Sequence, residues 1–250
     1  MLKEEISEVP GSQKDVQISI IIATYNSELH IKECLESIIA QSFKNLEIII
    51  IDGKSTDQTI EMIKSLNLNN LHLVSEPDNG IYDALNKGIK LAKGKWMYFM
   101  GSDDRLLKGF SSLALKLKDK NTVYYGNSEP LDRLLSGEFS KYRLAKYCMN
   151  HQSILYPSGV FKKYTYDLKY SVLADYALNL KLWGDKEFTK QHYAITIVRY
   201  CMDGFSSTNK DLLFIKDRNS LIRKNLGWII YLRFLYKRFK DQTKPDALEM

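Results

Sequence analysis

The sequence predicts an α/β protein with a mostly parallel central sheet, helices on its faces and a helical extension at the C-terminus. Two observations support this. Through the first hundred residues, short runs of β-branched and apolar residues alternate with amphipathic segments, a rhythm typical of right-handed parallel crossovers. Polar and acidic residues follow each run, and open sheets of this kind bind ligands at the carboxyl ends of their strands.

Four strands and three helices are expected in this first part. The helices repeat apolar residues at helical spacing. We expect Ser27 to cap the first helix, which contains Ile31–Ile39, and Ser55 or Thr56 to cap the second, while Ile81–Leu91 forms the third. The strands are near-continuous apolar runs, a pattern typical of strands buried on both faces: Gln17–Ala23, Leu46–Ile51, Leu71–Val74 and Lys95–Met100.

The second half is less regular. It contains a strand at Thr122–Tyr125, an apolar segment at Ser153–Tyr156, a helix at Leu173–Trp183 and a strand at Ala194–Tyr200. The capping residues Ser206–Thr208 predict the start of a C-terminal helical region. We therefore expect a flexible segment over residues 1–15, one domain over 16–207 and a basic helical extension over 208–250.

Charge is unevenly distributed along the chain. The 250 residues carry a net charge of +6, yet Leu213–Lys240 alone holds eight basic residues and one acid, a net +7. The remainder is near neutral, whereas nucleic-acid-binding proteins concentrate Lys and Arg on the binding face. Nucleic acid is therefore not an expected partner.

Cysteine usage and the absence of targeting signals predict a cytoplasmic protein. Cys34, Cys148 and Cys201 form no CxxC pair, so they indicate neither a disulfide framework nor a zinc site. The N-terminus has acids and no apolar core, unlike a signal peptide. No stretch reaches the roughly 20 apolar residues of a membrane span.

Two nucleotide-binding motifs are excluded. Gly53–Lys54–Ser55 looks like the end of a phosphate-binding loop, but the glycine required five residues earlier is replaced by Ile48. No glycine-rich dinucleotide fingerprint follows the first strand, where Thr24–Tyr25–Asn26 stands. The sequence therefore predicts neither a P-loop NTPase nor a Rossmann dehydrogenase.

Two adjacent acids, Asp103 and Asp104, follow the fourth strand. Neighbouring carboxylates repel each other unless a cation or hydrogen-bond donors neutralise them. A Mg²⁺ or Mn²⁺ ion that bridges diphosphate oxygens would do so. The residues alone leave an alternative open, a solvated turn in which Asp104 caps a following helix.

Five segments, in this order, resemble the glycosyltransferases of family 2, which have the GT-A fold. The resemblance covers about residues 17–207. It implies an inverting, metal-dependent transfer of a single sugar from a nucleotide-diphosphate sugar to a cell-surface polysaccharide or a lipid-linked acceptor. The segments are ISIIIATYN, IKECLESIIAQSFKNLEIIIIDGKSTDQT, SEPDNGIYDALNKGIKLAKGKWMYFMGSDD, HQSILYP and LADYALNLKLW.

The resemblance also implies roles for single residues. It makes Asp103 and Asp104 the ligands of Mn²⁺ or Mg²⁺, Asp175 the general base, and His151 with Gln152 a pair on the acceptor side. Taken without the family, Asp175 is also an ordinary acid at a helix N-terminus, and His151 a structural histidine. Nucleotide-sugar binding falls to Ala23, Thr24, Tyr25, Asp52, Asp78, Asn79, Gly80, Tyr82, Asp83 and Asp103, of which both tyrosines either stack on the base or pack in the core.

Two positions depart from the family pattern. Gly53 follows Asp52 where a second acid often contacts uracil, so a UDP-linked donor is implied with one contact missing. Gly101 stands where the metal motif often opens with an acid, which either weakens the metal site or leaves Asp103 as its principal ligand. The departures keep open a non-catalytic nucleotide-sugar-binding or scaffold protein of the same fold. A nucleotidyltransferase is a further alternative.

The basic extension predicts a surface for a partner. Residues 226–240 combine Trp228 and several aliphatic and aromatic residues with four basic ones, a composition that suits an interfacial helix on an anionic membrane. Apolar residues at nearly every position suit equally a helix packed on the domain or in a homo-oligomer. The expected location is the cytoplasm, with contact to the cytoplasmic face of the inner membrane through residues 226–240 as one alternative.

Overall fold

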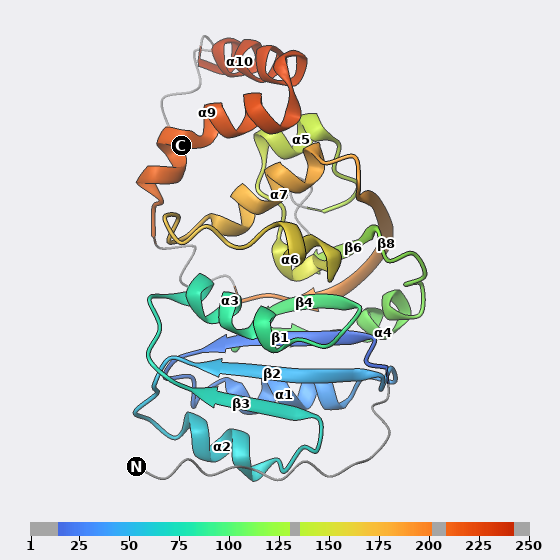
Figure 1. The fold of residues 1–250 in the computed structure, drawn as a ribbon, viewed down its shortest axis with the longest axis vertical. Coiled ribbons are helices and arrows are strands. Elements are labelled where there is room, and N and C mark those ends of the chain that lie inside the picture. The colour runs from blue at the N-terminus through green and yellow to red at the C-terminus, as the bar shows by residue number, and fades with distance from the viewer. Residues whose placement is uncertain (1–14, 131–135, 202–208, 243–250) are drawn as a thin grey trace.

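The computed structural model describes residues 15–130, 136–201 and 209–242 (Figure 1). The expected flexible segment lies almost wholly outside the described residues, and so does the capping triplet Ser206–Thr208.

The described residues form an eight-stranded mixed sheet of order β3-β2-β1-β4-β7-β6-β8-β5. The sequence predicts the parallel strands of its first half but not this order. There β1 (Ile18–Thr24), β2 (Leu46–Asp52), β3 (Leu71–Ser75) and β4 (Trp96–Gly101) run parallel. The strand β7 (Ile154–Pro157) pairs antiparallel with β4 and with β6 (Thr122–Glu129). The far edge adds β8 (Thr189–Arg199) and the short β5 (Arg105–Leu106).

The parallel strands end together, and this creates the edge at which ligands bind in such sheets. In register, Thr24 lies beside Asp52, Asp52 lies beside Ser75, and Ala23 lies beside Gly101. Figure 1 shows the arrowheads of β1, β2 and β3 pointing the same way. The polar residues that follow these strands are therefore brought side by side.

Alternate residues of β1 supply two cores, one on each face of the sheet. Ile21 faces the core built with α3 (Ile81–Leu91) and α7 (Ala174–Gly184). Ile20 and Ile22 face the opposite core, with α1 (Ile31–Ile39) and α4 (Gly109–Ala114). Burying each such side chain stabilises the fold by about 1.5–3 kcal/mol, so a strand with both faces apolar is held firmly.

Two helix starts differ from those predicted. Ser27 does not cap α1, which begins after His30, and its main chain accepts from His30 N and Ile31 N instead. The second helix, α2 (Thr59–Ser65), begins after Gln58 rather than at Ser55 or Thr56. Ser55 and Thr56 instead join the loops after β1 and β2: Asn26 N donates to Ser55 Oγ at 2.8 Å, and Thr56 N donates to Asn26 Oδ1 at 2.9 Å. Ser27 N donates to Thr59 Oγ1 at 2.7 Å.

Several short helices were not predicted. They are α5 (Lys141–Lys146), α6 (Gly159–Lys163), the 3-10 turn His151–Ser153 and α4. Each spans one or two turns, too short for a periodic apolar pattern to be recognised.

The C-terminal extension folds as two helices packed on the domain. Asp211 caps α9 (Leu212–Leu226) by accepting from Phe214 N, and also accepts from Val172 N and Leu173 N before α7. Gly227, at φ 92°, separates α9 from α10 (Trp228–Gln242). Within the described ranges, no helix has both the length and the apolar character needed to cross a bilayer.

Candidate functional site

Asp52 lies at the centre of the ligand-binding edge but is fully buried. Its carboxylate accepts from Ser75 Oγ at 2.6 Å, from Ser55 N at 3.0 Å and from Ser55 Oγ. These bonds fix the loop after β2. Gly53 N donates to Thr24 O at 2.8 Å, which ties that loop to the end of β1. Asp52 therefore supports the ligand-binding edge through its hydrogen bonds and has no exposed surface of its own.

Of the three predicted residues at the end of β1, Tyr25 is the open one, with 61% of its surface exposed. Ala23 is half-buried and Thr24 is buried. Thr24 Oγ1 has no hydrogen-bond partner among the residues that the structure describes. A ligand at this edge would thus meet the Tyr25 ring first.

Asp78 occupies the space above Gly53. A Cβ added to Gly53 would lie 2.7 Å from Asp78 Oδ2 and 3.5 Å from the ring of Tyr25. Any side chain at position 53 would therefore require the carboxylate of Asp78 to shift. The other oxygen, Oδ1, accepts from Gly80 N at 2.9 Å, so the carboxylate is held in this place.

The rest of the segment between β3 and α3 forms a tight helix entry. Gly80 has φ 104°, a conformation that favours glycine. Asp83 Oδ2 accepts from Asn79 N at 3.0 Å and lies 3.8 Å from Lys87 Nζ. Asp83 thus holds the turn at the N-terminus of α3, where a negative charge is favourable.

Tyr82 is buried beneath the edge. Its ring lies 5.2 Å from that of Tyr166, centroid to centroid. Its hydroxyl lies 2.7 Å from Val172 O and 2.9 Å from Asp175 Oδ1, and can donate to one of them at a time. The structure therefore links Tyr82 to Asp175, a contact that the sequence does not indicate.

The two acids after β4 have different surroundings. Asp104 is 1% exposed. Its carboxylate accepts from Gly101 N at 2.8 Å, Cys201 N at 3.0 Å and Gln152 Nε2. Asp103 is partly exposed and makes no hydrogen bond within the described part of the chain. Burial, and then the charge of Asp103, raise the pKa of Asp104 to about 6.

His151 and Gln152 connect two acids that come from different elements. His151 Nδ1 lies 3.1 Å from Asp175 Oδ2 at the start of α7, while the amide of Gln152 donates to Asp104 at the end of β4. Tyr98 donates to Gln152 O at 2.6 Å from within β4. The predicted acceptor-side pair is therefore a bridge between the metal motif and the predicted base.

Asp175 is buried, and each of its carboxylate oxygens has one partner among the residues of known placement, 15–130, 136–201 and 209–242. A carboxylate offers about four lone-pair sites, so further acceptor capacity remains. Burial acts to lower the pKa of His151, but the hydrogen bond and charge of Asp175, helped by Asp104, outweigh burial and raise it. The carboxylate of Asp175 therefore favours the protonated form of His151.

The residues present fit a divalent cation through Asp103. A Cβ at Gly101 would lie 2.6 Å from Asp103 Oδ1 and 2.8 Å from Asp104 Oδ2, so a third acid could not join them without displacement. No group of three or more His, Cys, Asp or Glu residues suited to a metal exists in the described ranges. Mg²⁺ and Mn²⁺ accept such a sparse protein set when diphosphate and water supply the other ligands.

Some residues that build the site were missed by sequence reasoning. Ser75 holds Asp52, and the Ser102 and Ser27 hydroxyls lie 2.8 Å apart, joining the loops after β4 and β1. The backbone N–H of Cys201 brings the end of β8 to Asp104. Serines in loops and a backbone donor carry no sequence signal of their own.

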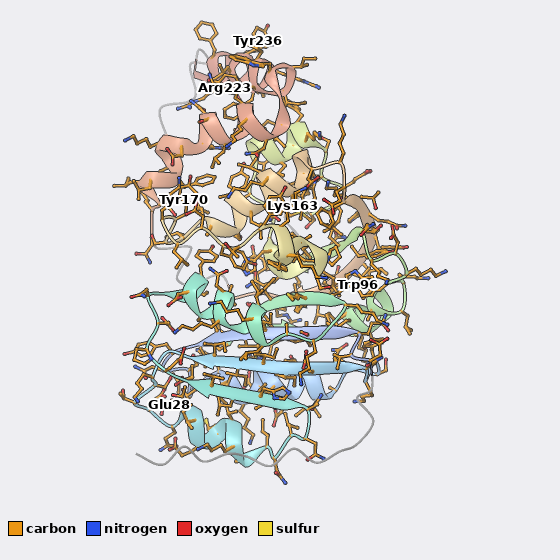
Figure 2. The ribbon with its side chains drawn as sticks, viewed as in Figure 1. Glu28, Trp96, Lys163, Tyr170, Arg223 and Tyr236 are labelled. Carbon is orange, nitrogen blue, oxygen red and sulfur yellow. The ribbon has the colours of Figure 1, made fainter. Side chains whose placement is uncertain are left out.

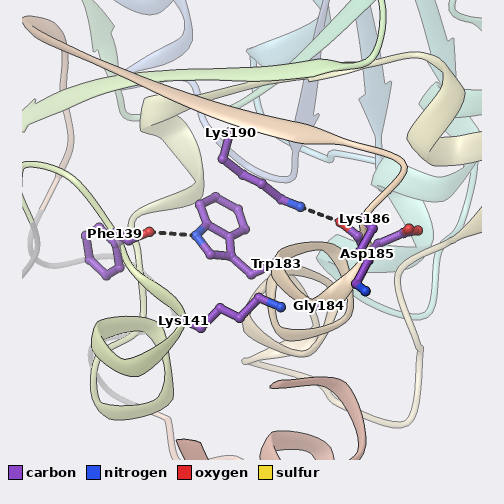
Figure 3. A pocket seen from close by; sticks show the side chains of 7 residues that line it. All are labelled: Phe139, Lys141, Trp183, Gly184, Asp185, Lys186 and Lys190. Atoms are coloured by element: carbon purple, nitrogen blue, oxygen red, sulfur yellow. Dashed lines mark hydrogen bonds between the residues drawn. The ribbon is translucent and has the colours of Figure 1, made fainter. Parts of the chain in front are cut away.

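A pocket of about 310 Å³ lies elsewhere, at the far end of α7 (Figure 3). There Trp183 Nε1 donates to Phe139 O at 2.9 Å, and Lys190 Nζ donates to Asp185 O at 2.7 Å. Asp185 follows Asp175 by ten residues, about 15 Å along a helix. This pocket is therefore separate from the carboxylate site.

Comparison with known proteins gives the chain relatives among glycosyltransferases. Residues 19–130 match the model of "Glycosyl transferase family 2". A PGL/p-HBAD biosynthesis glycosyltransferase of Mycobacterium bovis is 31% identical over 232 residues, covering 86% of this chain and 88% of that protein. A chondroitin synthase of Pasteurella multocida is 38% identical over 107 residues, 41% of this chain and 11% of that protein.

Solved structures share the fold. Residues 1–349 of S. aureus TarS, in complex with UDP-GlcNAc, superpose with a TM-score of 0.71 at 19% identity, over 90% of this chain and 73% of that one. The mannosyltransferase PcManGT of Pyrobaculum calidifontis, in complex with GDP-Man and Mn²⁺, superposes with a TM-score of 0.62 at 15% identity, over 99% of this chain and 71% of that one. The fold is therefore GT-A, and the chain belongs to the family 2 glycosyltransferases, enzymes that transfer a sugar.

Proposed function

We propose that this glycosyltransferase moves a single sugar, with inversion and with a divalent metal ion, from a UDP-linked donor to a polysaccharide or lipid-linked acceptor. The observation that carries the proposal is the His151–Gln152 bridge, which joins the acids after β4 to Asp175. It couples a candidate diphosphate site to a candidate base across two elements.

Asp103 is the metal ligand in this proposal. Its partly exposed carboxylate supports the assignment. The carboxylate of Asp104 instead accepts hydrogen bonds from three protein donors and holds the loop after β4. Bound there, Mn²⁺ or Mg²⁺ would neutralise the charge that develops on the departing nucleoside diphosphate.

Asp78 and Tyr25 select the base. Tyr25 offers an exposed ring for stacking, and Asp78 Oδ2 takes the place of the acid missing at Gly53. A carboxylate accepts from the imide N–H of uracil. The structural neighbour TarS, solved in complex with UDP-GlcNAc, supports a UDP-linked donor.

Asp175 is the general base. The acceptor hydroxyl must lose its proton as its oxygen attacks the anomeric carbon, and a positioned carboxylate can accept it. Tyr82 and His151 hold the two oxygens of Asp175 and fix their direction. His151 lies on the acceptor side of the site in this proposal.

The acceptor is a polysaccharide or a lipid-linked glycan, and the reaction takes place in the cytoplasm. The free thiols Cys34, Cys148 and Cys201 support a reducing compartment.

A donor screen tests the proposal. Purified protein is incubated with UDP-, GDP- and CDP-sugars with Mn²⁺ or with excess chelator, and released nucleotide is quantified. Nucleotide release from a UDP-sugar that requires the metal is the expected result. Unchanged turnover in chelator would contradict the metal requirement, while saturable UDP binding without turnover on a broad acceptor panel would favour a non-catalytic scaffold.

A further inference from the structure

The helix α10 has two apolar faces, of which only one is packed against other described residues. Phe234 is buried, and Ile230, Tyr231 and Leu235 are partly buried against the core beneath. On the other face lie five large side chains that are 58–82% exposed, here called the outer stripe: Trp228, Ile229, Leu232, Tyr236 and Phe239. Figure 2 shows Tyr236 at the end of the molecule farthest from α2.

The outer stripe is continuous. At 3.6 residues per turn its five members fall within about 100° of the helix circumference. Soluble proteins rarely leave a contiguous apolar patch of this kind uncovered, and such patches mark contact surfaces. A helix that packs with one face and keeps a second apolar face outward is thus partnered on one side only.

Basic side chains border the stripe. Around the helix, Lys240, Arg233 and Lys237 follow the stripe in that order, at about 100° per residue. Residues 209–242 contain nine basic residues and three acids. Asp211 accepts from three backbone donors, while Asp217 pairs with Lys169 and Asp241 with Lys237. The potential around the stripe is therefore positive.

We propose that the outer stripe of α10 binds a membrane surface that carries anionic lipids, with the helix lying in the plane of the interface. Trp and Tyr suit this boundary because one end of each is apolar and the other polar. The neighbouring Lys and Arg residues are attracted to anionic headgroups. With 15 residues, about 22 Å, α10 is too short to cross a hydrocarbon core of about 30 Å.

A second copy of the chain fits this surface less well. A two-fold interface through the stripe would set the same patch against itself. When the two copies of α10 pair antiparallel, Arg233, Lys237 and Lys240 of one copy face the same basic residues of the other, and like charges across an interface are costly. Charge complementarity therefore favours the lipid surface. The inference does not depend on the chemistry of sugar transfer.

Tryptophan fluorescence offers a direct test with the full chain. The protein has three tryptophans; Trp228 is 61% exposed, while Trp96 and Trp183 are each 3% exposed. Titration with phosphatidylglycerol–phosphatidylcholine vesicles should shift the emission to the blue and protect it from iodide, with co-sedimentation in parallel. Pure phosphatidylcholine vesicles should bind at least about tenfold more weakly, as expected when several basic residues each contribute about 1 kcal/mol.

Matched variants locate the contact. Ile229→Ser/Leu232→Ser removes two exposed members of the stripe and should weaken vesicle binding by about tenfold or more. Leu213→Ser/Ile215→Ser removes two exposed residues, 53% and 58% exposed, from the start of α9 and should leave binding unchanged. Both pairs are exposed, so circular dichroism should find both variants folded.

Three outcomes would overturn the proposal. The first is an emission spectrum that does not move at saturating anionic lipid. The second is equal loss of binding in the α9 control, which would remove the assignment to the stripe. The third is a concentration-dependent dimer in analytical ultracentrifugation that the Ile229→Ser/Leu232→Ser variant abolishes while vesicles fail to bind, which would assign the stripe to self-association.

Discussion

His151 Nδ1 lies 3.1 Å from Asp175 Oδ2, although the two residues are 24 positions apart. The contact joins the 3-10 turn after α5 to the first turn of α7, and the neighbouring Gln152 continues it to Asp104. A side-chain path thus runs from the end of β4 to the buried acid on α7.

The variant Asp175→Asn tests the base. Because an amide cannot accept the proton of the acceptor hydroxyl, kcat should fall by about 10²–10⁴-fold. UDP binding, measured by calorimetry, should be unchanged, since the donor contacts lie elsewhere. Asp185→Asn, at the opposite end of α7, is the matched control and should keep kcat. Transfer at the wild-type rate in Asp175→Asn would remove the base assignment.

The same pair predicts a pH dependence. The pKa of His151 lies above the ordinary histidine value of 6.5, because the hydrogen bond and charge of Asp175 outweigh burial. A raised histidine pKa contributes stability that is fully present below 6.5 and is lost as pH rises through the folded-state pKa. In the Asp175→Asn variant, NMR titration of the His151 ring should give a lower pKa than in the wild type, and the unfolding free energy should depend less on pH in this window. An unchanged pKa would contradict the pairing.

Substitutions of Asp103 and Asp104, the two acids after β4, should affect different properties of the protein. Asp104→Ala leaves the donors of Gly101, Cys201 and Gln152 without their acceptor and should lower the free energy of unfolding by about 1–3 kcal/mol. Asp103→Ala should change it by no more than about 0.5 kcal/mol, yet abolish the Mn²⁺-dependent part of nucleotide binding. Chemical denaturation and calorimetry measure the two quantities. Equal effects on both would contradict the division of roles.

Base selection should depend on Asp78. Asp78→Asn keeps an oxygen for Gly80 N but can place an NH₂ group where Oδ2 stands, beside Gly53. An amide donor cannot accept the uracil imide N–H, so UDP should bind about 10–100-fold more weakly, as for loss of a charge-assisted hydrogen bond. Binding of CDP should fall less, because cytosine presents an acceptor at that position. Competition calorimetry gives the ratio.

A paired substitution then checks whether positions 53 and 78 share one space. Gly53→Asp alone should weaken UDP binding, because the new Cβ would lie 2.7 Å from Asp78 Oδ2. Adding Asp78→Ala frees that space and should restore binding towards the wild-type value. Additive losses in the double variant, rather than recovery, would show that the two carboxylates do not substitute for each other.

The parallel half of the sheet and the gathering of polar residues at its edge were predictable from the amino-acid pattern alone. The runs in β1, β2 and β4 are apolar on both faces, so they have one favourable environment, the middle of a sheet with helices on both sides. Because parallel strands end at one edge, the residues after them were predictable as neighbours. The five family segments then identified the enzyme class.

Contacts between distant segments set which of these residues face the site. Asp104 is turned inward by donors 48 and 97 residues away in the chain, Gln152 and Cys201. Tyr82 reaches Asp175 across 93 positions. Periodicity reports only local environment, so it cannot distinguish an acid that a distant donor buries from one left open.

In the C-terminal extension, too, composition and packing determine different features. Its composition predicted a helix that is both basic and apolar, but left open whether the helix packs on the domain or binds a partner. The break at Gly227 and the burial of Phe234 show that one face of α10 packs on the domain. The exposure of Trp228 and Ile229 on the other face depends on which side the domain covers, because helical spacing defines faces and only packing decides which of them is buried.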